Sequence, residues 1–210
     1  ITHEREDPGP QIEQFTTALA PLIDAGKFAC VLVQFPYSFH ANPANRAYLG
    51  RLREGFGDLP VVVEFRSREW IEERTFEELR ALQLGFCCVD QPPFPSLVPP
   101  VAVATGPVAY VRFHGRNRLT WWDRGRESWE RYDYLYSREE LEEWTGKVRE
   151  LASQAKDVYL IFNNHYRGQA VRNARMMAGL LPPETVVPLG DEDGGVGGEA
   201  EGGAGRPLFQ

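Results

Sequence analysis

The stretch Val61-Val62-Val63-Glu64-Phe65-Arg66 decides the fold, because its first half is apolar on both faces and its end is charged. A strand that is apolar on both faces is typical of a parallel sheet covered by helices. Four similar runs lie at 30–35, 86–90, 108–115 and 157–164. Segments of helical periodicity lie between or beside them, at 12–25, 45–56, 75–82, 137–151 and 169–181. This order predicts an α/β fold with a five-stranded parallel sheet.

Two helix starts carry the Ser/Thr-x-x-Glu pattern of a capping box. One is Thr75-Phe76-Glu77-Glu78, and the other is Ser137-Arg138-Glu139-Glu140. We expect Gly85 to end the helix that begins at the first of these boxes.

Five such strands fit two architectures, an open doubly wound sheet or part of an eight-stranded (β/α) barrel. No strand is followed by a G-x-G-x-x-G or P-loop sequence, so the nucleotide-binding open sheet loses support.

Composition describes an ordinary globular chain of 210 residues with 42% hydrophobic residues and a net charge of −7. Much of the negative charge lies in the Gly- and acid-rich stretch 190–210, which we expect to be a disordered tail after one domain at 1–189. The remainder of the chain is nearly balanced in charge, which argues against a globally basic nucleic-acid footprint.

No apolar run is long enough for a membrane span, and no signal segment opens the chain, so a cytoplasmic protein is expected. Three cysteines without C-x-x-C spacing, Cys30, Cys87 and Cys88, predict buried thiols.

Polar side chains occur where each predicted strand ends. The C-terminal ends of parallel strands line the reaction site of a barrel, so these side chains predict a site. Alternation places Glu64 with Arg66 on one face and Arg112 with His114 on one face. The structural alternative is a buried ion-pair network, for example Glu64 with Arg112, that orders the sheet. The full set of strand-end groups is Gln34, Glu64, Arg66, Asp90, Arg112, His114, Asn163, Asn164 and His165.

Several long motifs resemble the YecE-like family named domain of unknown function 72. They are T-H-E near the start, L-V-Q-F-P at 32–36, V-E-F-R with Trp70 at 63–70, Y-V-R-F-H-G-R-N at 110–117, F-N-N-H-x-x-G-Q-A-V-x-N-A at 162–174 and P-L-F at 207–209. The resemblance implies a TIM-like (β/α) barrel and supplies no established reaction. It also implies an upstream part with the first strands of the barrel, which this chain does not include. We therefore expect a missing N-terminal segment of the same barrel as a partner, and aggregation of the 210 residues alone.

The last predicted helix begins just after Asn163-Asn164-His165-Tyr166-Arg167, and a helix N-terminus favours an anion. Late loops of barrels often hold a phosphate, and here they also carry Arg116 and Asn117. We therefore expect an anionic or phosphorylated ligand. The two asparagines could instead only tie loop backbone together. The ligand-binding candidates are Gln34, Arg66, Arg112, Arg116, Asn117, Asn163, Asn164, His165 and Arg167.

His114, Glu64 and Asp90 are the candidate catalytic residues of a hydrolase or lyase acting on a phosphoester or a sugar-like substrate. His114 is favoured as the acid/base because an unperturbed histidine titrates near neutrality. The competing hypothesis is a non-catalytic module that binds nucleic acid or a metabolite in the same pocket. A divalent metal held by Glu64, Asp90, His114 and His165 has only weak support, because no local ligand pair is present.

The loop from Leu119 to Tyr134 is rich in aromatic and arginine residues. Such side chains can stack on bases or sugar rings, and long loops often form lids. The alternative is a hydrophobic cluster that caps the barrel. Its rings are Trp121, Trp122, Trp129, Tyr132 and Tyr134.

Overall fold

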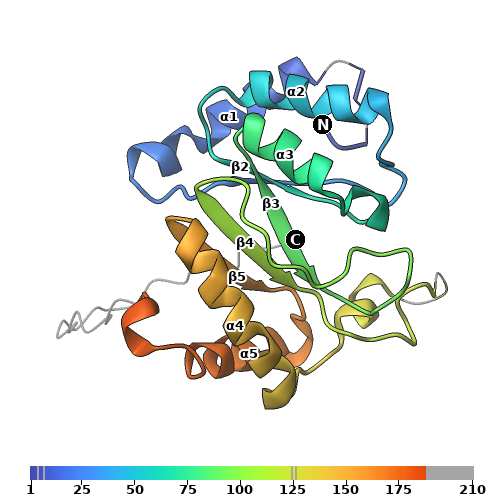
Figure 1. Cartoon of the computed structure of the whole chain (residues 1–210), viewed down its shortest axis with the longest axis vertical. Coiled ribbons are helices and arrows are strands. Elements are labelled where there is room, and N and C mark those ends of the chain that lie inside the picture. The colour runs from blue at the N-terminus through green and yellow to red at the C-terminus, as the bar shows by residue number, and fades with distance from the viewer. Residues whose placement is uncertain (4, 7, 124, 126, 188–210) are drawn as a thin grey trace, which may run out of the picture.

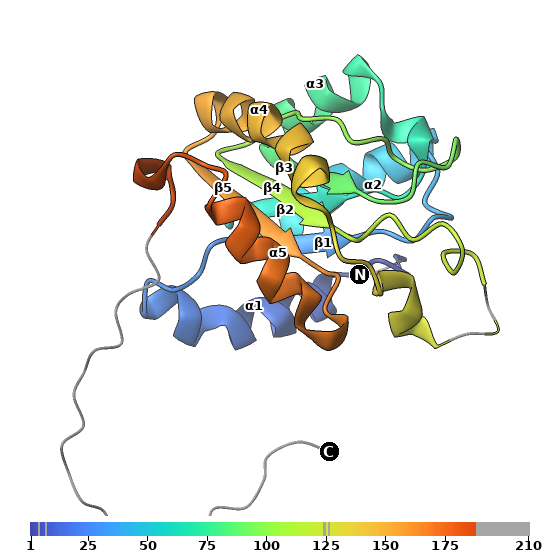
Figure 2. The same cartoon turned by 90° about the horizontal axis from the view of Figure 1, so that it is seen from below.

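The computed structural model describes residues 1–187 except residues 4, 7, 124 and 126. Within this part, five parallel strands form one curled sheet in the order β1-β2-β3-β4-β5, with every strand beside the next one in the chain (Figures 1 and 2). The strands are β1 (Val31–Gln34), β2 (Val61–Glu64), β3 (Leu84–Asp90), β4 (Val108–Phe113) and β5 (Asp157–Phe162). The order never reverses, and a doubly wound sheet requires a reversal. The strands described therefore form a half-barrel rather than the open doubly wound alternative.

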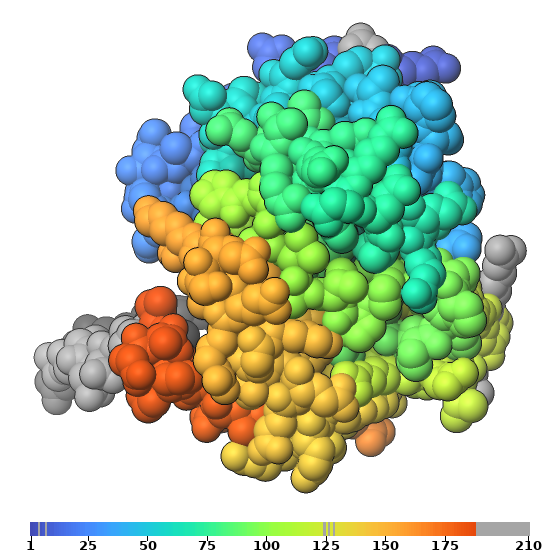
Figure 3. Space-filling view, in the orientation of Figure 1, coloured from blue at the N-terminus to red at the C-terminus, as the bar shows by residue number. Residues whose placement is uncertain are grey.

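Five α-helices are present in the same part of the chain. They are α1 (Gly9–Asp24), α2 (Pro43–Phe56), α3 (Glu73–Ala81), α4 (Arg138–Gln154) and α5 (Gln169–Ala178). Short 3₁₀ helices lie at η1 (Arg68–Trp70), η2 (Ser128–Tyr132), η3 (Tyr166–Gly168) and η4 (Pro183–Thr185). Figure 3 shows one side of the molecule as a continuous surface built largely by α2, α3 and α4. The expected tail at 190–210 lies outside the described residues.

The core lies between the sheet and these helices. Val63 and Val111 on the strands and Phe65 just after β2 are buried, and on the helices Leu52 and Trp144 belong to the same core. The opposite face of the sheet is more open, since Leu32, Tyr110 and Tyr159 are only half-buried and Ile161 is 38% exposed. The two faces therefore differ, although the strands read as apolar on both.

The third helix differs from its prediction at both ends. Its N-cap is Glu72, and Thr75 lies inside the first turn, where its hydroxyl accepts hydrogen bonds from Arg46. The expected capping box at Thr75 was wrong, because the helix begins before this buried residue. The chain reverses at Gln83, which has a φ of 53°, and not at Gly85.

Gly85 instead lies within β3, where the neighbouring strands approach closely. A Cβ atom there would lie 2.9 Å from Val62 Cγ2 and 3.0 Å from the Val108 carbonyl oxygen. The residue is therefore glycine because of strand packing, and it does not terminate the helix. By contrast, the capping box at Ser137 is confirmed, with Ser137 and Glu140 each bonding the other's backbone N–H.

Candidate functional site

Glu64 is the centre of the polar cluster at the C-terminal ends of β1, β2 and β4. Its side chain is fully buried. Oε2 accepts a hydrogen bond from Arg112 Nη1 at 2.6 Å, and Oε1 lies 3.1 Å from both Arg66 Nη2 and His114 Nε2. A buried carboxylate is costly unless it is paired, and here three donors surround it. The expected pairing of Glu64 with Arg112 is therefore present in the structure.

Gln34, the last residue of β1, connects Arg66 and Arg112 through hydrogen bonds. Its Oε1 accepts hydrogen bonds from Arg66 Nη2 at 3.1 Å and from Arg112 Nη1 at 2.8 Å. The register pairs Gln34 with Glu64, so both side chains project from the same face of the sheet. Four residues on three strand ends thus form one connected cluster, which we call the Glu64 cluster: Gln34, Glu64, Arg66 and Arg112, with His114 as the fifth member.

His114 is fully buried and bonded at both ring nitrogens. Nε2 faces Glu64 Oε1, and Nδ1 lies 3.2 Å from Asn163 Nδ2. Burial lowers the pKa of His114 to about 4, and Arg66 and Arg112 add to this effect while Glu64 opposes it. The ring is therefore neutral at pH 7, with Nε2 donating to Glu64 and Nδ1 accepting from Asn163. The sequence favoured His114 as the acid/base from the pKa of an unperturbed histidine, and burial lowers this pKa because it disfavours the charged ring.

The Glu64 cluster carries more positive than negative charge. Burial alone would raise the pKa of Glu64, but Arg66, His114 and Arg112 outweigh it and hold that pKa far below its usual range. The carboxylate is therefore ionised, and one negative charge faces two guanidinium groups. Arg112 Nε is buried and has no hydrogen-bond partner among the described residues. This excess favours an anion at the edge of the cluster.

An open cleft of about 280 Å³ lies beside the Glu64 cluster. Gln34 and Arg66 form part of its wall, and the segment after β1 forms another part. The loop at 119–134, which we call the aromatic loop, contributes Trp121, Trp122, Arg131 and Tyr132 to the lining. The remaining lining residues are His3, Phe35, Pro36, Tyr37 and Leu97.

Some rings of the aromatic loop pack against His114, and others line the cleft. Trp121 is only 7% exposed, and it and Tyr132 lie 6.4 Å and 5.9 Å from the ring centre of His114. These two rings shield His114 from solvent, which is the capping role that the sequence left open. Trp122 is different, since it is 52% exposed at the rim of the cleft.

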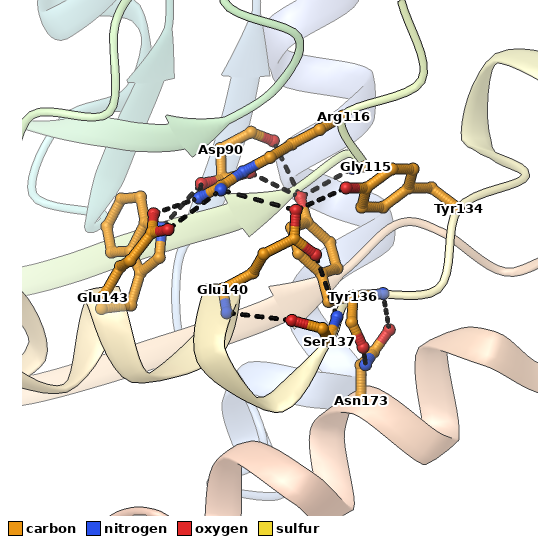
Figure 4. Close-up of polar contacts among 10 residues, drawn as sticks. Asp90, Gly115, Arg116, Tyr134, Tyr136, Ser137, Glu140, Glu143 and Asn173 are labelled. Atoms are coloured by element: carbon orange, nitrogen blue, oxygen red, sulfur yellow. Dashed lines mark hydrogen bonds and ion pairs between the residues drawn. The ribbon is translucent and has the colours of Figure 1, made fainter.

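Asp90 does not join the Glu64 cluster. The register pairs Val89 with Arg112 and Asp90 with Phe113, so Asp90 projects from the helix-covered face. There its carboxylate accepts two bonds from Arg116, at 2.9 and 2.7 Å, one from Tyr136 at 2.8 Å and one from Trp144 at 2.7 Å (Figure 4). The carboxylate is 1% exposed and fully bonded. It fastens α4 to the sheet and has no open path to the cleft.

Arg116 continues this network toward α4. Besides Asp90, its guanidinium bonds Glu143 at 2.8 Å and lies 3.6 Å from Glu140 (Figure 4). Hydrogen bonding to Asp90 is the main cause of the raised pKa of Arg116. The group is thus committed to the helix and does not face the cleft.

Two further ligand-binding candidates, Asn117 and Asn164, bond groups of the protein itself and not the cleft. Asn117 donates to the carbonyl oxygens of Glu130 and Asp133, so it braces the aromatic loop. Asn164 is buried and donates to Tyr134 O and Asn173 Oδ1. Of the two asparagines that the sequence suggested as loop ties, Asn164 bonds loop backbone in this way, whereas the Asn163 side chain bonds His114 instead.

The start of α5 is also not brought to the cleft. His165 bonds the Asn163 carbonyl oxygen and is exposed, and the Arg167 guanidinium lies over the Tyr166 ring. At the first residue of α5, the Gln169 side chain bonds Tyr134 N and Asp133 Oδ1. The anion site expected at this helix start therefore lacks Arg116 and Asn117 from the loop after β4. Arg116 bonds Asp90, and Asn117 bonds the backbone of the aromatic loop.

The suggested metal ligands do not come together. Glu64 and His114 are neighbours, but Asp90 lies on the other face and His165 is in the exposed turn before α5. Over the described parts of the chain, no group of three His, Cys, Asp or Glu side chains could hold a metal ion.

All three cysteines are free thiols and form no disulfide. Cys87 and Cys88 are buried and Cys30 is half-buried. Burial raises the pKa of Cys30 and of Cys88 to about 11, so neither is a reactive thiolate near neutrality.

The sequence and the half-barrel both resemble those of known proteins. Residues 1–192 match the model of a family described as "Protein of unknown function DUF72". The chain belongs to the DUF72 family. It is 37% identical over 181 residues to UPF0759 protein YunF of Bacillus subtilis (strain 168), an alignment covering 82% of this chain and 64% of YunF. The resemblance inferred from the sequence motifs is thus confirmed.

Two solved structures of DUF72 family proteins share the fold. That from Thermotoga maritima MSB8 is 42% identical with a TM-score of 0.79, covering 83% of this chain and 66% of that one. That from Enterococcus faecalis V583 is 32% identical with a TM-score of 0.77 and the same coverage. This chain spans just under two thirds of the length of these relatives. Across its described residues, no helix combines the length and hydrophobicity that crossing a bilayer requires.

Sequence reasoning did not find several residues of the cleft and of the network around Asp90. Tyr136, Trp144 and Asn173 lie in helices or loops far from the strand ends in sequence, and no spacing links them to Asp90. Tyr37 and His3 line the cleft, and only their nearness to the L-V-Q-F-P and T-H-E motifs could have drawn attention to them.

Proposed function

We propose that this DUF72 protein binds an anionic, phosphate-like group in the cleft beside the Glu64 cluster. The observation that carries the proposal is two largely buried arginines facing one carboxylate, with Arg66 on the cleft wall. Arg131 adds a further cation among the lining residues. Guanidinium groups bind phosphate and carboxylate strongly through charge-assisted hydrogen bonds.

Binding is better supported than catalysis. Glu64 and His114 already satisfy each other and their neighbours, and Asp90 is bonded on the far face of the sheet. The catalytic roles of these three residues, in a hydrolase or lyase, stay predictions. A turnover that disappears in His114→Ala while ligand binding survives would support them.

The binding experiment is calorimetric titration with inorganic phosphate at low ionic strength. Arg66→Gln should weaken phosphate binding at least about tenfold, because one charged donor is lost. Arg131→Gln, at the rim, should weaken it without disturbing Glu64. Arg74→Gln on the exposed side of α3 is the matched control and should bind as the parent does. Unchanged affinity in both cleft variants would refute the proposal.

The salt dependence of affinity distinguishes the kinds of partner. A nucleic acid, the alternative partner, releases several counterions, so its affinity falls steeply with salt. A small metabolite with one phosphate gives a shallow slope. The cytoplasmic location expected from the sequence stays a prediction.

We also infer that the half-barrel is part of a closed TIM-like (β/α) barrel. The unreversed order of five parallel strands, the curl of the sheet and the greater length of the relatives support this. Strands supplied at the open edges of β1 and β5 would complete it.

A further inference from the structure

We infer that the ligand of the cleft is a nucleotide unit, with its phosphate at Arg66 and its flat base against Trp122 and Tyr37. This inference rests on the proposed anion site and adds the chemistry of the remainder of the ligand. The two aromatic residues line the same cleft as Arg66.

The exposure of Trp122 is the first reason. It follows Trp121 directly, yet Trp121 is nearly buried over His114 whereas Trp122 is half exposed. Tyr37, whose ring meets that of Trp122, is 38% exposed. These two partly exposed rings leave apolar surface beside an arginine that a stacked ligand would cover.

The arrangement of the rings is the second reason. Trp122 and Tyr37 are 5.9 Å apart and meet at 81°, so they form a corner rather than a closed stack. Phe94, 5.9 Å from Trp122, is tilted by 53°. Neither described neighbour lies parallel on Trp122, so a planar ring can still stack on it. Base–aromatic stacking contributes roughly 1–3 kcal/mol per base.

The lining chemistry favours a base over a sugar. Beside the two rings the cleft is lined by Pro36, by the buried Phe35 and Leu97, and by the polar side chains of His3, Gln34, Arg66 and Arg131. Gln34, the amide in the wall, already bonds both arginines. A polyhydroxylated sugar needs several directional polar partners, whereas a flat base can stack on the open face of Trp122. The volume of about 280 Å³ is just below the roughly 300–1,000 Å³ that is typical of ligand sites, so the cleft has room for no more than a small ligand such as one nucleotide unit.

The test compares inorganic phosphate, ribose 5-phosphate and adenosine 5′-monophosphate by calorimetry on the full chain. We expect adenosine monophosphate to bind at least tenfold more tightly than ribose 5-phosphate. Trp122→Ala should abolish that preference and leave phosphate and ribose 5-phosphate affinities unchanged. Trp129→Ala is the matched control, because Trp129 lies in the same loop but stacks on Tyr166 at 4.3 Å and does not line the cleft.

The outcomes separate the two proposals. If phosphate binds but the base adds no affinity, the nucleotide inference is overturned and the anion site stands. If none of the three probes binds, both are overturned. A Trp122→Ala variant that weakens all three probes equally also overturns the inference. A thymidine oligonucleotide that binds more tightly than the monophosphate would assign the unit to a single strand, and equal affinity to a free nucleotide; both support the inference.

Discussion

Glu64 is the residue on which the charge balance of the strand ends depends. Glu64→Gln would leave Arg66 and Arg112 facing each other without their shared counter-charge. Removing one partner of a buried ion pair costs about 3–5 kcal/mol. We expect a loss of unfolding free energy of that size in urea denaturation. Glu69→Gln is the control, because Glu69 pairs with His40 on the surface and should cost less than about 1 kcal/mol. Equal effects would mean that the buried carboxylate is not the stabilising group.

His114 should make stability depend on pH between 7 and 5. Its pKa is about 4 in the folded protein and 6.5 as a free side chain, so in this window the unfolded chain binds the extra proton. Stability therefore falls as pH falls, by about 2 kcal/mol between pH 7 and pH 5. The depressed pKa of Glu64 adds nothing here, because its contribution is lost only below the usual carboxylate range.

Urea titrations at pH 7 and pH 5 measure this slope. His114→Gln should remove most of it, and His165→Gln, in the exposed turn before α5, should keep it. A slope that survives in His114→Gln would assign the pH dependence to other groups.

For single residues, the sequence predicted which side chains of the Glu64 cluster share a face, but it did not predict the surroundings of Asp90 and His114. Alternation within a strand placed Glu64 with Arg66 and Arg112 with His114, and both pairs share a face. It could not place Asp90, because the face of one strand relative to another depends on register, and the pairing of Asp90 with Phe113 is visible only in the structure. Nor could it foresee that His114 is buried beneath Trp121, which removes its titration from the neutral range.

Among the elements, α4 begins with a cap that the structure confirms. Ser137 Oγ accepts from Glu140 N while the Glu140 carboxylate accepts from Ser137 N. Ser137→Ala should cost about 1 kcal/mol of unfolding free energy, measured by urea denaturation. Ser153→Ala, near the other end of α4 where Ser153 bonds only the Glu150 carbonyl oxygen, should cost far less. A smaller effect at Ser137 than at Ser153 would contradict the capping role.

The same four-residue pattern failed at Thr75, and the contrast shows what a motif omits. Ser137 has the extended backbone of an N-cap, with ψ at 167°, whereas Glu72 takes that conformation three residues before Thr75. Spacing alone gives no backbone angle. The Thr75 side chain is held by Arg46 from α2, a contact between elements that a local pattern does not contain.

For the whole molecule, the pattern of apolar runs predicted a parallel sheet but not its strand order. The same alternation of strands and helices suits a doubly wound sheet and a barrel, because both bury both faces of each strand. The sequential order β1 to β5 decides between them for these strands. It leaves one side of β1 and one side of β5 without a partner strand in the described chain.

The open edges should be visible in amide hydrogen exchange. Val31 N and Phe35 N bond toward β2, so alternation directs the amides of Leu32 and Gln34 to the open side. In β5, Asn163 N bonds toward β4, which directs the amides of Leu160 and Phe162 outward.

At low protein concentration these outward amides should exchange far faster than those of β3, which is paired on both sides. The apolar edges should also associate, so the same amides should gain protection as concentration rises, in step with a growing mass in sedimentation. Outward amides as well protected as those of β3 at low concentration, in a chain that stays monomeric, would show that these edges are already covered and would remove the reason to expect the aggregation predicted from the sequence.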